Sequence, residues 1–182
     1  MSAIRHPEPR SLEQVRAWHE AMNESLFAHR ARVLANIRRE APAVESRFMG
    51  MSRGEVGDFF HAQRKELDDL SILAMMASAE AAIRADYARR LYRRGGDGLT
   101  REYVALRGRL GAQVRASLDE DILEAMRGSG LVSLHLVSRF RDALRLRHWL
   151  AHGRYWKLTL GGYAYSLEDV FRIADELIQS LP

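Results

Sequence analysis

Cysteine is absent from this chain of 182 residues, and proline occurs only four times. Without thiols the protein can form neither disulfides nor zinc sites with thiolate ligands. The scarcity of proline, together with abundant alanine, leucine, arginine and glutamate, favours helices. We therefore expect an all-α fold.

Long hydrophobic runs are also lacking. The longest apolar stretch extends from Ser71 to Ile83, which is too short to cross a bilayer and includes Glu80. Residues 1–10 contain Pro7 and Pro9 and lack the hydrophobic segment of a signal peptide. We expect these residues to form a loose arm, and the protein to be cytoplasmic and not bound to a membrane.

The composition fits one folded domain over residues 1–182. Hydrophobic residues make up 47% of the chain and charged residues 29%, as in an ordinary globular protein. The formal net charge of +4 favours a polyanionic partner such as RNA, although many basic proteins bind no nucleic acid.

Apolar residues recur at helical spacing, and caps and turns divide the chain into segments. Pro42 ends the first segment, and Ser52 and Glu55 have the spacing of a capping box. The predicted helices cover residues 12–39, 52–94 with a bend or break near 68–69, 100–114, 117–127, 132–152, and a last helix capped by Ser166. This is an up-and-down bundle of five to six helices.

A small β-hairpin is predicted before the last helix. Residues 157–160 alternate polar and apolar side chains, Gly161 and Gly162 can turn the chain, and residues 163–165 alternate again.

The most informative stretch is residues 140–156, which contains two of the seven histidines and two of the three tryptophans. At about 100° per residue, the side chains of Arg141, Arg145, His148 and His152 fall within roughly 60° of one another and form a basic stripe. Arg147 falls instead among the apolar positions, where a solvated arginine is not expected.

A guanidinium on the apolar side of a helix keeps its proton and therefore needs an anionic partner. Glu80 has a similar position within its own apolar stretch, with Arg84 one turn later. Arg147 could pair with Glu80 and define how two helices pack. Alternatively, Arg147, His148 and His152 face a phosphodiester while Glu80 orients Arg147, and the two interpretations are compatible.

The order Arg-His-x-x-x-His-Gly at residues 147–153 resembles the Arg-x4–6-His motif of the HEPN superfamily, in which a polar residue usually follows the arginine. Arg145 also satisfies the longer spacing, so two arginines compete for the same role. The helix that carries Glu80 and Arg84 is similar to that family as well. The resemblance covers residues 60–180.

The resemblance implies a HEPN-like bundle that acts as a metal-independent endoribonuclease on single-stranded RNA. HEPN ribonucleases are commonly homodimers with the active site at the interface, and their products carry 2′,3′-cyclic phosphate and 5′-hydroxyl ends. Such proteins often serve as toxins or defence effectors, so a protein antitoxin is a further partner. Other members are inactive and bind RNA or a partner protein.

The residue types in the motif suit this reaction without a cofactor. Cleavage by the ribose 2′-OH needs a base, an acid and cations that offset the charge on the phosphate. His152 can be the base or the acid near neutral pH, and His148 can position the phosphate or transfer the second proton. Arg147 can clamp phosphate oxygens through its fork of donors.

One copy of the motif supplies few catalytic groups for this chemistry. On a straight helix Arg147 and His152 point about 140° apart, so one helix does not aim both at one atom. A two-fold dimer that places two such helices side by side would bring both sets into one cleft.

Other basic residues are candidates for binding the RNA backbone. Arg141, Arg154 and Tyr155 flank the motif. On the first helix, Arg30 and Arg32, with Arg38 and Arg39, form either a solvated face or a track for RNA.

Two other classes of function remain open. One is a non-catalytic HEPN module that binds RNA or a partner protein, and the other is a helical regulator that binds a small molecule, since bundles readily form apolar pockets. His148 and His152 have the spacing of a metal-binding pair, but no obvious carboxylate on that segment offers a third ligand. We therefore expect no metal site.

Overall fold

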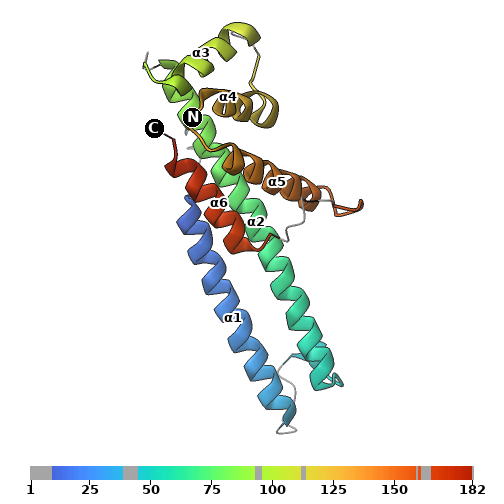
Figure 1. The fold of residues 1–182 in the computed structure, drawn as a ribbon. Coiled ribbons are helices and arrows are strands. Elements are labelled where there is room, and N and C mark those ends of the chain that lie inside the picture. The colour runs from blue at the N-terminus through green and yellow to red at the C-terminus, as the bar shows by residue number, and fades with distance from the viewer. Residues whose placement is uncertain are drawn as a thin grey trace, which may run out of the picture. The chain divides into compact units, whose positions relative to one another are not determined.

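The computed structural model describes residues 10–38, 45–92, 96–111, 114–158, 160 and 165–181. Over these residues the protein is helical and contains no strand, which confirms the predicted all-α class (Figure 1). The elements are α1 (Leu12–Arg38), η1 (Ser46–Phe48), α2 (Arg53–Tyr92), α3 (Gly98–Leu110), η2 (Leu118–Ile122), α4 (Leu123–Ser129), α5 (Leu134–Ala151) and α6 (Leu167–Gln179). Within the described ranges, no helix combines the length and apolarity needed to span a bilayer.

The chain forms two compact units. The N-terminal unit is Glu13–Ser71, and the C-terminal unit is Ile72–Pro182 together with Met1–Leu12. Helix α2 contributes residues 53–71 to the first unit and 72–92 to the second. The single domain predicted over residues 1–182 stays a prediction.

In the N-terminal unit, α1 packs antiparallel to the first part of α2 (Figure 1). His19 Nε2 lies 2.6 Å from Asp68 Oδ1, and Arg64 Nε donates to Asn23 Oδ1 at 2.9 Å. The end of the unit next to η1 has an apolar core of buried Val33, Phe48, Val56 and Phe60.

The capping box predicted at the start of α2 is confirmed. Ser52 N donates to Glu55 Oε2 at 2.7 Å, and Glu55 N donates to Ser52 Oγ at 3.3 Å. The helix then continues to Tyr92, and the break predicted near Asp68 is not seen.

Helix α3 begins and ends earlier than predicted. Asp97, in an extended conformation, is the cap, and its Oδ1 accepts from Thr100 N at 2.9 Å, so Thr100 lies inside the helix. The helix ends at Leu110 because Gly111 has a φ of 79°, which glycine adopts without steric cost.

The spacing of Ser117 and Glu120 predicts a second capping box, and Ser117 does cap the next segment, but with a different carboxylate. Its Oγ accepts from Glu120 N at 3.4 Å, while the reciprocal carboxylate comes from Asp121, which accepts from Ser117 N at 2.7 Å. The segment starts as the π-helical turn η2 and continues as α4.

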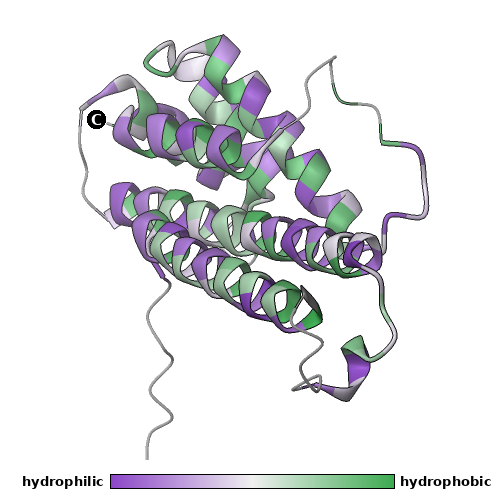
Figure 2. Ribbon diagram, turned by 90° about the horizontal axis from the view of Figure 1, so that it is seen from below, coloured by the Kyte–Doolittle hydropathy of each residue, from purple (hydrophilic) through white to green (hydrophobic). Residues whose placement is uncertain are grey.

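Amphipathic helices form the core of the C-terminal unit. Helix α4 contacts α3, η2 and α5, and α5 contacts α6. Helix α6 begins with the capping box of Ser166 and Asp169 and buries Val170, Ile173, Ala174 and Leu177. Figure 2 shows apolar and polar residues alternating along these helices, as expected of elements with one buried side.

The predicted β-hairpin is not seen. Described residues 157, 158, 160 and 165 belong to no strand. The predicted turn at Gly161 and Gly162 lies outside the described residues, as do the loose arm at residues 1–9 and Arg39.

Candidate functional site

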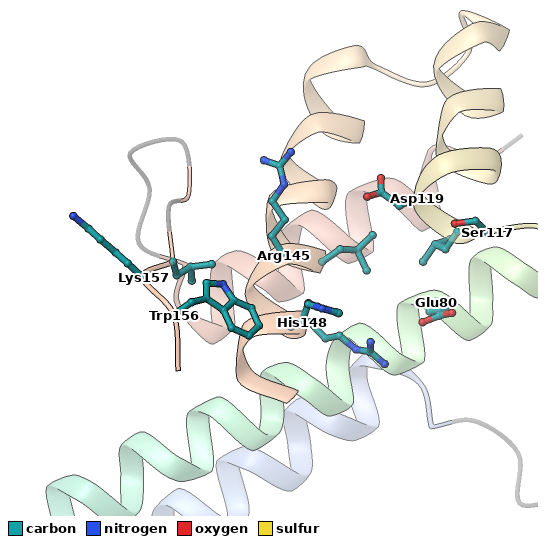
Figure 3. A pocket seen from close by; sticks show the side chains of 11 residues that line it. Glu80, Ser117, Asp119, Arg145, His148, Trp156 and Lys157 are labelled. Atoms are coloured by element: carbon teal, nitrogen blue, oxygen red, sulfur yellow. The ribbon is translucent and has the colours of Figure 1, made fainter. Parts of the chain in front are cut away.

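A cavity of about 570 Å³ lies in the C-terminal unit beside α5. Figure 3 shows Glu80 on α2, Ser117 and Asp119 at η2, His148 near the end of α5, and Trp156 in the segment after α5 around this space. Apolar, cationic and carboxylate side chains all contribute to its wall. The lining residues are Glu80, Ser117, Leu118, Asp119, Leu144, Arg145, Arg147, His148, Trp156, Lys157 and Leu158.

Arg147 lies on the inner side of α5, as its helical position predicts. Its neighbours Ala143, Leu146 and Leu150 are buried, and Arg147 itself is half-buried. The helical repeat also assigns Ala151, the last residue of the helix, to this side, but Ala151 is exposed. In the part of the chain that the structure describes, no carboxylate bonds to Arg147.

Glu80 lines the same cavity but bonds to a different arginine. Arg84 Nε donates to Glu80 Oε1 at 2.8 Å, and Arg84 Nη1 donates to the carbonyl of Ala116 at 2.9 Å. The i,i+4 spacing on one helix makes this pairing easy to form. The predicted Glu80–Arg147 ion pair is therefore not present among the described residues, and Glu80 is neutralised by Arg84.

The competing arginine, Arg145, has a different environment. Its side chain is 64% exposed and donates to Asp142 Oδ1 at 2.9 Å. Arg145 and Arg147 both line the cavity, but Arg147 alone of the two is half-buried and lacks a bonded carboxylate among the described residues. The structure thus distinguishes two residues that the motif spacing leaves equivalent.

Arg141 connects three elements of the C-terminal unit. It donates to Asp119 Oδ1 at 2.7 Å and lies 2.6 Å from Glu124 Oε1, so it connects α5 to η2 and α4. The hydrogen bond from Arg141 lowers the pKa of the Glu124 carboxyl below its ordinary value. The RNA-binding role predicted for Arg141 stays a prediction, although its donors already serve these acceptors.

The two histidines of the motif lie against each other. The ring centroids of His148 and His152 are 4.2 Å apart with a tilt of 48°, and both side chains are exposed. His148 lines the cavity beside Arg147, whereas His152 is outside the lining. The structure therefore brings Arg147 and His148 to one cavity and places His152 next to His148.

The end of α5 determines what lies beside these histidines. Gly153 has a φ of 82°, its N–H donates to Leu150 O at 3.4 Å, and the N–H of Arg154 donates to Trp149 O at 3.1 Å. These two bonds form a Schellman motif, which reverses the chain after a helix. The predicted helix end at this glycine is confirmed.

The reversed segment carries Trp156 back towards the histidines. Trp149 Nε1 donates to the carbonyl of Trp156 at 2.7 Å. The ring of Trp156 then lies 6.0 Å from that of His148 and 6.3 Å from that of His152, measured between centroids. From the sequence, Trp156 is expected either to fill a small apolar core beside the predicted hairpin or to stack on bases, and the structure places it near the histidines.

The remaining predicted residues lie around this reversed segment. Tyr155 is 81% exposed and packs its edge on Trp156 at 4.6 Å, and Arg154 is half-buried with a φ of 60°. Lys157 lines the cavity with an exposed side chain that extends away from His148 (Figure 3). Sequence reasoning assigned Lys157 only to a strand, because its place in the cavity depends on the reversal at Gly153.

Among the described residues, no group of three His, Asp or Glu side chains is arranged to hold a metal ion. Comparisons with protein families, with curated proteins and with solved structures find no match for this chain. Its function is therefore argued from the chemistry of its own side chains.

Proposed function

We propose that this protein is a metal-independent endoribonuclease of HEPN type that cleaves single-stranded RNA. The observation that carries the proposal is Arg147: its guanidinium lines a cavity beside His148, and no described carboxylate bonds to it. A phosphodiester would supply the missing negative charge and accept two hydrogen bonds from the fork of donors.

The paired histidines suit the proton transfers of this reaction. The ribose 2′-oxygen forms a bond to phosphorus while the bond from phosphorus to the 5′-oxygen breaks. One neutral imidazole takes the proton from the 2′-OH, and a protonated one gives a proton to the departing 5′-oxygen. His152 and His148 fill these roles, and Arg147 offsets the charge on the phosphate.

A homodimer is part of the proposal. His148, His152 and Tyr155 are exposed, and His152 does not line the cavity of its own chain. A second copy related by a two-fold axis would place His152 of one chain near Arg147 of the other. A cytoplasmic toxin or defence effector, held inactive by a protein antitoxin, is the biological role that such a nuclease would have.

The size and wall of the cavity also favour a second candidate, a regulator that binds a small molecule. A volume of about 570 Å³ is within the range typical of ligand sites. Leu118, Leu144, Leu158 and Trp156 contribute apolar surface to its wall, in addition to the charge of Arg147. An aromatic anion would fit this wall.

Purified protein incubated with single-stranded RNA in EDTA tests the proposal. We expect fragments with 2′,3′-cyclic phosphate ends, and a loss of about 100-fold or more in rate for His152→Ala, because a proton-transfer group is removed. His135→Ala is the matched control, since His135 is exposed near the start of the same helix. Its rate should equal that of the wild type.

Three results would contradict nuclease function. Equal cleavage by the wild type and His152→Ala would indicate a contaminating nuclease. RNA binding of equal strength without any cleavage would favour the non-catalytic module. Neither binding nor cleavage of RNA, with a bound small molecule recovered from the purified protein, would favour the regulator.

A further inference from the structure

A second, smaller cavity lies between α1 and α2 in the N-terminal unit. Its volume is about 140 Å³, and its polar lining consists of Arg30, His61 and Arg64. No carboxylate contributes to the lining among the described residues. The cavity is too small for a nucleotide or a drug-sized ligand, since such sites occupy about 300–1,000 Å³. Its size suits a single compact anion.

Arg64 is held in place from two sides. Its Nε donates to Asn23 Oδ1 at 2.9 Å, and its guanidinium carbon lies 4.3 Å from the ring centroid of Phe27. This combination of hydrogen bond and cation–π contact fixes the plane of the group. Among the described residues its hydrogen bond uses Nε alone, so both Nη groups remain available to a ligand.

The other two basic side chains complete the lining. Arg30 on α1 and His61 on α2 are exposed, and neither has a partner among the described residues. Arg32, two residues further along α1, has its Nη2 3.9 Å from Glu45 Oε1 and is outside the lining. Of the two arginines in the first part of the predicted RNA track, Arg30 lines this cavity and Arg32 does not.

We propose that this cavity is a binding site for a phosphate group. A fixed guanidinium presents two donors in the geometry that phosphate oxygens match, and a second arginine adds charge without a competing carboxylate. The phosphate group belongs either to the backbone of an RNA strand or to a free phosphate ion. The first alternative rests on the proposed nuclease function, and the second does not.

Gly57 offers a variant that closes the cavity without changing charge. It lines the cavity, and a Cβ placed on it meets nothing within 4 Å. Gly57→Leu would fill the space and favour the helix. It would also leave the Arg64–Asn23 bond in place. Arg64→Gln removes the donors instead, and Arg53→Gln, at the exposed start of the same helix, is the matched control for charge.

The first experiment titrates inorganic phosphate into the full-length protein at constant pH and ionic strength. The readout is the ring NMR signal of His61, assigned with His61→Gln. We expect a saturable shift in the wild type and in Arg53→Gln, and none in Arg64→Gln or Gly57→Leu. Because the probe is in this cavity, phosphate bound beside Arg147 does not contribute.

The second experiment measures the affinity of a labelled oligouridine for full-length His152→Ala over a range of salt concentrations. We expect Arg64→Gln and Gly57→Leu to weaken binding severalfold, and Arg64→Gln to reduce the salt slope by about one. A His61 shift with phosphate but unchanged RNA affinity assigns the site to a free phosphate ion. If inorganic phosphate leaves the His61 signal unchanged and Arg64→Gln binds the oligouridine as tightly as its parent, the inference is wrong. It is also wrong if Gly57→Leu behaves as its parent in both experiments. Neither readout involves cleavage, so failure of the nuclease proposal would be seen separately.

Discussion

Arg147 is the residue on which the candidate site depends. Its position on the inner side of α5 costs free energy, because a charge is removed from water without a carboxylate bonded to it among the described residues. If such a residue is kept for function at the expense of stability, replacing it with an apolar residue of similar length should stabilise the protein.

We therefore expect Arg147→Met to raise the free energy of unfolding by about 1 kcal/mol and to eliminate RNA cleavage. Urea denaturation and the cleavage assay measure the two effects. Arg145→Met is the control, because Arg145 is mostly exposed and its variant should change stability by less than about 0.5 kcal/mol. Lower stability in Arg147→Met would reveal a structural partner, and cleavage lost only in Arg145→Met would make Arg145 the working arginine.

Arg90 shows the opposite case, a buried arginine with a structural role. Its side chain is 8% exposed and lies 2.7 Å from Asp86, which is 5% exposed. We expect Arg90→Ala to lower the free energy of unfolding by about 3–5 kcal/mol, because Asp86 loses its buried partner. Arg89 also contacts Asp86 but is 56% exposed, so Arg89→Ala should cost less than about 1 kcal/mol. Similar costs in the two variants, measured by urea denaturation, would contradict this distinction.

At the scale of elements, the end of α5 links stability to the candidate site. Gly153 has a φ of 82°, and Gly108 lies inside α3 with no atom near its missing Cβ. Gly153→Ala should lower the free energy of unfolding by about 1 kcal/mol and reduce cleavage. The reason is that an alanine at this φ would strain the chain reversal that brings Trp156 to the histidines. Gly108→Ala should instead stabilise the protein by up to about 1 kcal/mol and leave cleavage unchanged. Thermal denaturation and the cleavage assay check both. Unchanged stability in Gly153→Ala would show that the reversal does not need glycine.

The capping box of α6 makes stability depend on pH. The hydrogen bond from the Ser166 hydroxyl, together with that from its backbone N–H, lowers the pKa of Asp169 in the folded protein. A lowered pKa means that this contribution is present above the ordinary carboxyl pKa, near 4, and is lost as pH falls through the lower folded value.

We expect Asp169→Asn to flatten the fall in unfolding free energy below about pH 4, because the substituted residue has no carboxyl group to titrate. Urea denaturation between about pH 2 and pH 6 measures the slope. Glu176→Gln, exposed in the last turn of α6, is the control. An equal change in the slope for both variants would assign the effect to net charge.

For the whole molecule, the proposed shared site predicts a dimer. Light scattering should give twice the chain mass of 20.8 kDa at micromolar concentration. Mixing the inactive variants Arg147→Ala and His152→Ala should restore part of the activity, because a mixed dimer contains one site with both residues intact. A monomeric mass, or no restored activity in mixtures that exchange subunits, would contradict the shared site.

The local elements of this protein could be predicted from sequence. Ser52 with Glu55, Ser166, and Gly153 marked helix ends correctly, because a cap bonds to backbone groups only a few residues away. The inner position of Arg147 followed from the helical repeat alone.

The partners of the charged residues were decided only by the tertiary structure. Glu80 bonds to Arg84 instead of Arg147, and Asp121 takes the place of Glu120 at the cap of η2. Trp156 reaches the histidines through a bond from Trp149 to its carbonyl, just before the segment in which the sequence predicted a strand. Local hydrogen bonds are encoded by residues a turn apart. The choice among several acceptors depends on distances between helices, and these distances exist only once the helices have packed.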